Sequence, residues 1–466
     1  MQDWLGLRNI AQSGTLFETP DLIDIPVTLG FHAEPTCPQC QKPMAKDGSV
    51  SMRLQDAPIW GKRVFLTGKR QRRRCRPCNE ILVADSPDIV AGKKPRTKRL
   101  VRYVEDALTK APATQVAKAV GLSDDVIRSI GHGLHERLSA KHRWATPDLL
   151  AVDNIKVGRG REYQVLFDQR EGYAIGLVES GTADAVIDEF RRLELDADAI
   201  RVFSSDMSKA NKTFAGSFKK ALHVADRFHV YDACNTAVGS VLNARVAELK
   251  KLHEYGQAAA LKAAKARLKW HRAAIEARGP ASELQFDDIP DELARHGTVA
   301  AAYRARLQLD RIYTSPDRAR AEIALRKFYA LCEDPLISDR MTPALKYVHG
   351  HERQVLAYFD ALQIVGEELW SPNTNALERR NVEIQDIWRS AKGYRKDFAS
   401  FQLRVLYHRF QFGLHIIECD ACGRFEGPSA PADVLTRSQQ PIARPGEKRC
   451  SQCSDESGFA SHSQLD

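Results

Sequence analysis

Five short apolar runs between residues 148 and 230 limit the folds that this chain can adopt. In chain order they read LLAVDNIKV, YQVLFDQ, YAIGLVES, IRVFSSD and ALHVADRF, and each favours a strand. The helix-like TADAVIDEFRRL follows the third run, and MSKANKTFAGSFKK lies between the fourth and the fifth. Three strands with short connections, followed by alternating helix and strand, predict a mixed α/β domain with the strand order of the ribonuclease-H-like fold.

Two aspartates in this series stand where a metal-ion catalyst needs them. Asp153 lies in the middle of the first predicted strand and Asp206 ends the fourth, so the fold would bring them side by side. Glu378 opens a helix-like stretch, NALERRNVEIQDIWR, in which Asn381 shares its face. Carboxylates that converge from strand ends and a facing helix can hold Mg²⁺ or Mn²⁺, and a pair of such ions catalyses phosphodiester cleavage and transfer.

Each of these acids also has a purely structural interpretation. Asp153 could cap the turn after its strand, and Asp206 could be a helix N-cap, where Asp is favoured. Glu378 could be a solvent-facing helix residue. The order of the surrounding segments, rather than any single acid, favours a catalytic site.

Eight of the ten cysteines form four Cys-x-x-Cys pairs. Such a turn directs two thiolates at one ion, and two turns complete a tetrahedral structural Zn²⁺ site. The first two pairs are separated by 34 residues and the last two by 27, enough for a small hairpin in each case. Disulfides and a redox motif are the alternatives, but nothing indicates an oxidising compartment, and no pair opens a helix after a strand. We expect two zinc sites, formed by Cys37, Cys40, Cys75 and Cys78 and by Cys419, Cys422, Cys450 and Cys453.

Positive charge is concentrated near the first zinc site. Between Lys62 and Arg76 there are eight Lys and Arg residues and no acid, and between Lys93 and Arg102 there are six more. Such clusters indicate phosphate contacts, with a solvated surface as the alternative. The segment before Cys75 alternates like a β-hairpin, so its last three arginines would face solvent or phosphate. The cations that we assign to DNA in this region are Arg70, Arg72, Arg73, Arg74, Lys93, Lys94, Arg96 and Lys98.

Residues 97–138 have the periodicity of three helices. Gly121 permits a tight turn between the second and third, and Ser123 can cap the third. This pattern is typical of a helix-turn-helix, whose second helix enters the major groove of DNA and would carry Arg128. A plain three-helix packing unit is the alternative, and two aspartates at the start of the reading helix disfavour tight groove contact.

The C-terminal half is dominated by helical patterns. Residues 231–370 read as a helical insertion between the second and third acids. Beyond it, Trp388 and Arg389 suit stacking on an unpaired base, although an ordinary core tryptophan is the alternative. Lys392 and Arg395 add further cations for DNA.

The 466 residues exceed one compact core, so we expect a multidomain α+β protein. The expected segments are an N-terminal leader (1–36), a zinc finger (37–92), a helix-turn-helix domain (93–140), a catalytic core in two parts (148–235 and 371–415), a helical insertion (236–370) and a C-terminal zinc ribbon with a polar tail (416–466).

Taken together, these blocks resemble the DDE-type insertion-sequence transposases of the ISL-three (ISL3) family over roughly residues 37–410. CPQC, LQDAPIWGKRVFL and RQRRRCRPC are similar to that family's zinc finger. AVDNIKVGRGREYQVLFDQ, VFSSDMSKAN and NALERRNVEIQDIWRSAKGYRKDFASFQLR resemble the three segments with its catalytic acids, and VADRFHVYDACN resembles a fourth segment. The resemblance implies catalytic roles for Asp153, Asp206 and Glu378 and supporting roles for Asp226, His229 and Asn381.

The chain departs from the family pattern at three points. Asn154 stands where the family has an acid directly after the first Asp. The family has an asparagine before its catalytic Glu. Here Asn373 and Asn375 both precede Glu378, and the asparagine is displaced by one residue from the family's position. The second cysteine quartet lies outside the common pattern.

The resemblance implies a transposase that binds the terminal inverted repeats of its element in double-stranded DNA, cleaves there and joins the ends to target DNA. Synapsis of two ends implies a homodimer or larger assembly. A non-catalytic DNA-binding regulator derived from such an enzyme and a structure-selective Mg²⁺-dependent nuclease are the alternatives. No apolar run approaches the roughly 20 residues of a membrane helix and no secretory signal is visible, so we expect no membrane partner and a bacterial, cytoplasmic protein that associates with the nucleoid when bound.

Overall fold

A computed structural model describes residues 7–90, 95–158, 160–263, 291–366, 375–410, 416–418 and 425–426. The chain divides into two compact units. Unit 1 contains residues 1–144 and 386–466, and unit 2 contains residues 145–385. Among the described residues, every helix is too short or too polar to span a bilayer.

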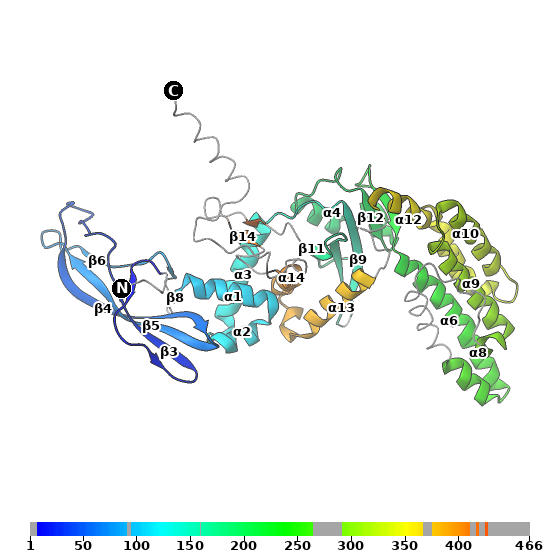
Figure 1. The fold of residues 1–466 in the computed structure, drawn as a ribbon, viewed down its shortest axis with the longest axis horizontal. Coiled ribbons are helices and arrows are strands. Elements are labelled where there is room, and N and C mark those ends of the chain that lie inside the picture. Colours follow the sequence, from blue (N-terminus) through cyan, green and yellow to red (C-terminus); the bar gives the residue numbers. More distant parts are fainter. Residues whose placement is uncertain are drawn as a thin grey trace, which may run out of the picture. The chain divides into compact units, whose positions relative to one another are not determined.

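One sheet of eight strands forms the N-terminal part of unit 1 and is drawn in blue in Figure 1. Its central path runs β1-β3-β5-β4-β8-β7, with β2 paired to β3 and β6 to β5. Because β3 pairs in parallel with β5, the segment before the first cysteine belongs to the same sheet as the finger. Gly68 allows this pairing, since a Cβ there would lie 1.7 Å from the Val27 carbonyl oxygen. The strands are β1 (Ile10–Gln12), β2 (Phe17–Glu18), β3 (Leu22–Leu29), β4 (Ala45–Ile59), β5 (Lys62–Arg74), β6 (Ile81–Val83), β7 (Ile89–Val90) and β8 (Arg96–Thr97).

Three helices follow, as the sequence predicts: α1 (Lys98–Lys110), α2 (Ala113–Val120) and α3 (Asp124–Lys141). Gly121 ends α2 with a φ of 69°, the left-handed geometry that favours glycine. Ser123 occupies the N-cap position of α3, but its side chain makes no capping hydrogen bond.

The segment 371–415, which we expected to form one part of a single domain, is divided between the units. Helix α13 (Asn375–Arg389) begins in unit 2. The 3₁₀ helix η1 (Lys392–Arg395) and α14 (Phe398–Tyr407) belong to unit 1, where α14 packs on α1 and α3. The cause is the apolar face of α14, whose buried Phe401, Leu403 and Tyr407 need a hydrophobic partner. A short strand pair, β14 (Ile417–Glu418) and β15 (Phe425–Glu426), completes the described part of this unit.

Unit 2 is built on a five-stranded sheet in the order β11-β10-β9-β12-β13. The first three strands along the chain pair antiparallel, whereas β12 and β13 run parallel to β9. Along the chain, the five strands and the helices between them follow the succession predicted from the five apolar runs. The sheet and its connections comprise β9 (Leu149–Val157), β10 (Arg161–Asp168), β11 (Tyr173–Val178), α4 (Ala183–Arg192), β12 (Val202–Ser205), α5 (Lys209–Ala215) and β13 (Leu222–Ala225).

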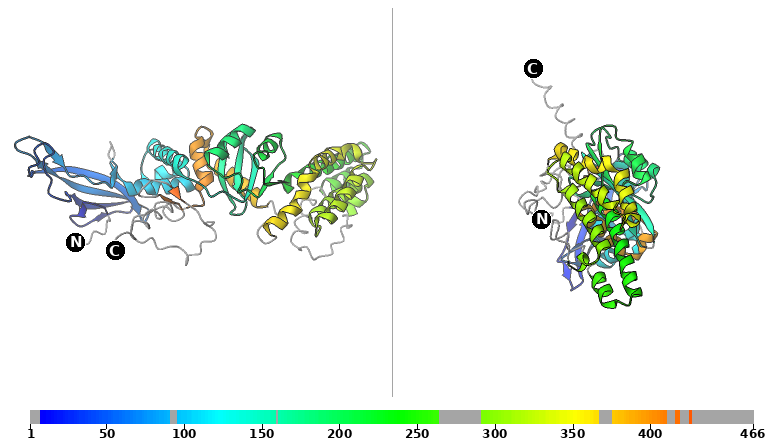
Figure 2. Two further views of the ribbon diagram at one scale, coloured as in Figure 1. Left: turned by 90° about the horizontal axis from the view of Figure 1, so that it is seen from above. Right: turned by 90° about the vertical axis from the view of Figure 1, so that its right-hand side faces the viewer.

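The long helix α6 (Arg227–Lys251) leads from the sheet into a helical bundle, drawn in green to yellow in Figures 1 and 2. One hydrophobic cluster extends from Leu149, Val202 and Val224 in the sheet to the helices of the bundle, so the two share a core. The bundle also contains α8 (Asp291–Ala294), α9 (Gly297–Tyr313), α10 (Arg318–Cys332), α11 (Ser338–Gly350) and α12 (Glu352–Val365).

Candidate functional site

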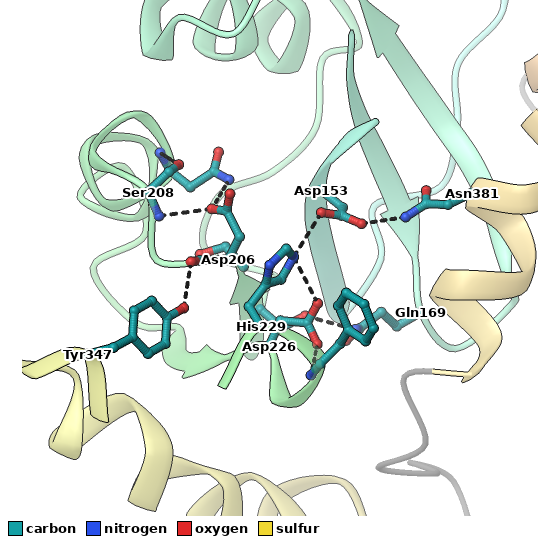
Figure 3. A network of polar contacts seen from close by, with 12 residues as sticks. Asp153, Gln169, Asp206, Ser208, Asp226, His229, Tyr347 and Asn381 are labelled. Carbon is teal, nitrogen blue, oxygen red and sulfur yellow. Dashed lines mark hydrogen bonds and ion pairs between the residues drawn. The ribbon is translucent and has the colours of Figure 1, made fainter. Parts of the chain in front are cut away.

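The register of unit 2 brings the first two predicted acids to neighbouring strands. Asp153 lies at the centre of β9. Strand β12 pairs in parallel with β9, and its last residue, Ser205, stands opposite Val152. Asp206 follows directly, so the backbone positions of the two acids lie side by side, Asp153 within β9 and Asp206 just after the end of β12. Figure 3 shows the two side chains on either side of His229.

Asp153 is buried, with 5% of its surface exposed, and both of its carboxylate oxygens have partners. Oδ1 lies 3.3 Å from His229 Nε2, and Oδ2 accepts a hydrogen bond of 2.5 Å from Asn381 Nδ2 (Figure 3). His229 stands in the first turn of α6, whose N-cap is Asp226. The Asp226 carboxylate caps the helix through the Phe228 N–H and lies 3.7 Å from His229 Nε2.

The charge state of His229 follows from these neighbours. Burial lowers the pKa of His229, but the hydrogen bond to Asp153 and the charges of Asp226, Asp153 and Asp206 outweigh it and raise the pKa to about 9. At neutral pH the imidazole is therefore protonated and donates from Nε2 to Asp153. One positive charge thus offsets part of the negative charge of the three aspartates.

Asp206 shapes the turn between β12 and α5. Its Oδ1 accepts from the Ser208 N–H at 2.9 Å and from Asn211 Nδ2 at 2.7 Å. The next residue, Met207, has a φ of 64°, which is uncommon for a side chain of this size. Tyr347 of α11 donates from its hydroxyl to the Asp206 carbonyl oxygen at 2.9 Å (Figure 3). The alternative interpretation of Asp206 as a helix N-cap is wrong, because Ser208 is the N-cap of α5. The Asp206 carboxylate organises the turn before that cap, and among the described residues its Oδ2 has no hydrogen-bond partner.

Glu378 lies on α13, and its side chain is outside the described residues. Asn381, three residues later on the same helix, contacts Asp153. Since positions three apart share a helix face, position 378 belongs to the face that meets β9.

The donor atoms around the two aspartates suit a hard cation such as Mg²⁺. Asn381 and Asn211 each turn a nitrogen to a carboxylate and leave a buried Oδ1 without a partner. The Oε1 of Gln169, whose amide nitrogen donates to Ser204 of β12, is likewise buried without a partner among the described residues. The Oδ1 of Asn154 is also buried without such a partner, but strand alternation directs it to the face of the sheet opposite Asp153. Oxygen ligands of this kind are those that Mg²⁺ prefers. However, Asp153 and Asp206 do not form a compact group of three potential ligands with any other described acid. A bound cation would therefore also need the carboxylate of Glu378.

The four cysteines of the first predicted zinc site form a compact cluster of potential metal ligands. The sulfur atoms of Cys37, Cys40, Cys75 and Cys78 all lie within 4.8 Å of one another, which makes them the one group of three or more potential ligands among the described side chains. Cys40 Sγ and Cys75 Sγ are 3.6 Å apart, close to the edge of a zinc–sulfur tetrahedron, about 3.8 Å for 2.3 Å bonds. A hydrogen bond from the Lys42 backbone and contacts with the other cysteines lower the pKa of Cys40 to about 7. The second predicted quartet, Cys419, Cys422, Cys450 and Cys453, lies outside the described residues.

Each Cys-x-x-Cys pair is followed by a residue with positive φ, Gln41 at 58° and Asn79 at 56°. The Cys37 N–H bonds to the Lys42 carbonyl, and the Cys75 N–H to the Glu80 carbonyl. The two pairs therefore form similar tight turns that direct their sulfur atoms to one point.

The arginines that we assigned to DNA are mostly engaged within unit 1. Arg70 pairs with Asp85, and Arg72 and Arg74 pair with Asp47. The expectation that all three arginines before Cys75 face outward is wrong for Arg73, which is buried and pairs with Glu34. Strand alternation is the reason, since successive side chains point to opposite faces.

The other predicted DNA contacts differ in their surroundings. Arg96 is half-buried, Lys98 is exposed, and Arg128 pairs with Asp397. Arg389 pairs with Asp386. Lys93 and Lys94, and the side chains of Lys392 and Arg395, lie outside the described residues.

Trp388 is 6% exposed and packs edge-on against Phe401. Its burial fits the alternative interpretation, a core tryptophan, rather than a platform for an unpaired base.

Two residues that hold Asp206, Asn211 and Tyr347, were not predicted from the sequence. Asn211 gave a local signal, because it follows Asp206 by five residues at the start of a capped helix. Tyr347 gave none, since it lies 141 residues away in the chain.

Two models of known protein families match parts of this chain. Residues 150–405 match a family model for ISL3 proteins that is described as "Transposase". Residues 33–78 match a second model, described as the zinc-finger of transposase IS204/IS1001/IS1096/IS1165. A search of curated proteins found no match to the chain. The first match covers more than half of the chain, and the second spans the cysteine quartet.

Proposed function

Because this chain belongs to the ISL3 family of DDE transposases, we propose that it cleaves the ends of its DNA element and joins them to target DNA at a site formed by Asp153, Asp206 and Glu378. The observation that carries this proposal is the contact between three distant segments. Asp153 on β9 meets Asn381 of α13 and His229 of α6, while Asp206 directly follows the neighbouring strand β12. The order of the five strands supports a ribonuclease-H-like core.

Asp153, Asp206 and Glu378 would hold the Mg²⁺ ions, and the amide oxygens of Asn381 and Asn211 could complete their oxygen-rich surroundings. Bound Mg²⁺ supplies positive charge that activates the attacking oxygen and stabilises the leaving one. The same site could serve cleavage by water and transfer by a DNA 3′-hydroxyl.

The remaining polar residues would orient the acids. Asn381 fixes Oδ2 of Asp153 and thereby holds the helix that carries Glu378 against β9. His229 keeps its proton on Nε2 between Asp153 and Asp226, so it orients Asp153 through Oδ1. Preorganised groups of this kind lower the cost of assembling the charged site.

The proposed substrate is double-stranded DNA, both the inverted repeats and the target. Helices α2 and α3 would read the repeats as a helix-turn-helix, and synapsis of two ends would require a homodimer or larger assembly. In this proposal the protein acts in the bacterial cytoplasm and associates with the nucleoid.

The test is cleavage of a duplex that contains the end of the element, with Mg²⁺ present or chelated. Asp153→Asn should abolish cleavage and leave DNA binding intact. A regulator would show no cleavage in the wild-type protein. A structure-selective nuclease would cut branched DNA without preferring the end sequence, and either result would overturn the proposal.

A further inference from the structure

The tip of the β4–β5 hairpin in unit 1 carries an exposed tryptophan that no contact within the described structure explains. Trp60 is 85% exposed, the largest exposure of any large hydrophobic side chain among the described residues. A buried indole is among the side chains that contribute most to the free energy of folding. An indole left in solvent makes no such contribution.

The backbone at the tip adds to this cost. Trp60 and Gly61 are the two central residues of the turn, with φ values of 50° and 75°. Turns with positive φ at both positions favour Asn followed by Gly, because a bulky side chain is strained there. The chain has the expected glycine but a tryptophan in place of the asparagine, at a position where neither packing nor turn geometry favours it.

Hydrogen bonds attach the stem of the hairpin to helices α1 and α2, and they restrict the position of the tip. The buried carboxylate of Asp56 accepts from Thr97, the N-cap of α1, and from Arg99. Gln55 donates to the carbonyl of Val120 at the end of α2. The stem therefore holds the tip in a defined place relative to α1 and α2, as the views of Figures 1 and 2 also show.

The tip lies next to the turn between α2 and α3. The side chain of Arg63, two residues after Gly61, lies so close to Gly121 that a Cβ there would be 2.7 Å from Arg63 Cδ. Arg63 and Lys118 are exposed, and neither forms an ion pair with a described residue. By contrast, Lys62 pairs with Glu18. Arg63, a cation without an acid partner among the described residues, thus lies at the turn after α2, three residues along the chain from Trp60.

We propose that Trp60 is a duplex-DNA contact, inserted into a groove or between base pairs beside the segment that α2 and α3 occupy. The inference rests on the proposed function for the identity of the ligand. Apolar side chains that enter DNA in this way are known to unstack base steps, and flanking cations neutralise the phosphates. Asp124 and Asp125 repel phosphate at the first turn of α3, so a contact from the hairpin tip would compensate for a weak approach there.

The experiment compares the full-length protein with Trp60→Asn, which gives the turn its favoured residue and removes the indole. Binding to a duplex from the element's end is measured without Mg²⁺ over a series of KCl concentrations. The variant should bind about tenfold more weakly, with an unchanged salt dependence, because stacking involves no ion release. Its melting temperature should equal or exceed that of the wild type, and its zinc content should be the same.

Two further variants make the result specific. Arg63→Ala should reduce the slope of log affinity against log salt by about one, as expected for the loss of a phosphate contact. Val50→Thr alters an exposed apolar side chain in β4 of the same hairpin, away from the tip, and this variant should bind like the wild type.

Wild-type affinity in Trp60→Asn would overturn the inference. So would a change in self-association, measured by sedimentation, with DNA binding unaffected, because the tip would then contact a second copy of the chain. Binding alone decides this question. Cleavage by the wild-type protein decides the proposed function separately, so either can fail without the other.

Discussion

The two candidate metal centres of this protein are built in opposite ways. The four cysteines stand in two local turns, each of which directs two sulfur atoms, and the β4–β5 hairpin between them brings the turns together. The acids stand on β9, after β12 and on α13, so only the folded sheet and helix bring their positions together. A site built from local turns depends on its ion, whereas a site built from distant segments depends on the fold around it.

Removal of zinc should have the largest effect, and it should be confined to unit 1. Structural Zn²⁺ contributes on the order of 10 kcal/mol in small zinc-binding domains. Cys75→Ser should therefore disorder the finger and abolish DNA binding, while amide hydrogen exchange in β9 and β12 stays slow. Ser51→Ala, on an exposed position of the same hairpin, is the control. Equal loss of protection in both units would show that the zinc site also supports unit 2.

Loss of an acid should have the reverse pattern, an intact fold without activity. Asp206→Asn and Glu378→Gln should each reduce cleavage about a thousandfold, because a catalytic metal ion is worth several kcal/mol of transition-state stabilisation. Glu383→Gln, on the same helix, removes an acid that pairs with Arg380 and should retain activity. If Glu378→Gln cleaves normally while Glu383→Gln does not, the third acid has been assigned to the wrong residue.

Acid should destabilise unit 1 through His142. This side chain is 3% exposed between Trp144 and Tyr407, and neither ring nitrogen has a hydrogen-bond partner in the part of the chain that the structure describes. Burial, with a smaller effect of Arg143, lowers its pKa from 6.5 to about 3. The unfolded chain therefore takes up a proton first, and stability present above pH 6.5 is lost as the pH falls towards 3, about 2 kcal/mol of it by pH 5.

His142→Phe removes this titration and keeps an aromatic ring in place. Urea unfolding of unit 1 should then depend less on pH between 6.5 and 4, and His32→Phe, at an exposed position, should leave the dependence unchanged. An unaltered pH dependence in His142→Phe would mean that other groups control the acid response.

The smallest expected effect concerns the hydroxyl that holds the backbone of Asp206. Tyr347→Phe removes one hydrogen bond, worth about 1 kcal/mol, and should slow cleavage about fivefold without weakening DNA binding. Tyr329→Phe is the matched control, because its hydroxyl bonds to Glu352 elsewhere in the helical bundle. Similar rates in both variants would show that the turn after β12 holds its shape without α11.

Much of the fold could be predicted because local patterns dictate it. The five strands of unit 2 were expected in their observed order, and the helices of 97–138 begin and end within a few residues of the prediction. The division of 371–415 between the two units was not expected. Periodicity identifies a helix and its apolar face, but it does not identify the surface that this face covers.

The sequence alone determined the zinc ligands and the candidate acids, since Cys-x-x-Cys spacing and acids at strand ends are local features. Tertiary structure decided which side chains serve each acid. Asn381, His229 and Tyr347 reach Asp153 and Asp206 from helices separated from them by up to 228 residues. Tertiary structure also placed Trp388 in the core and left Trp60 in solvent. The physical reason is that burial and long-range hydrogen bonds depend on what packs against a residue, and the chain brings those partners together only by folding.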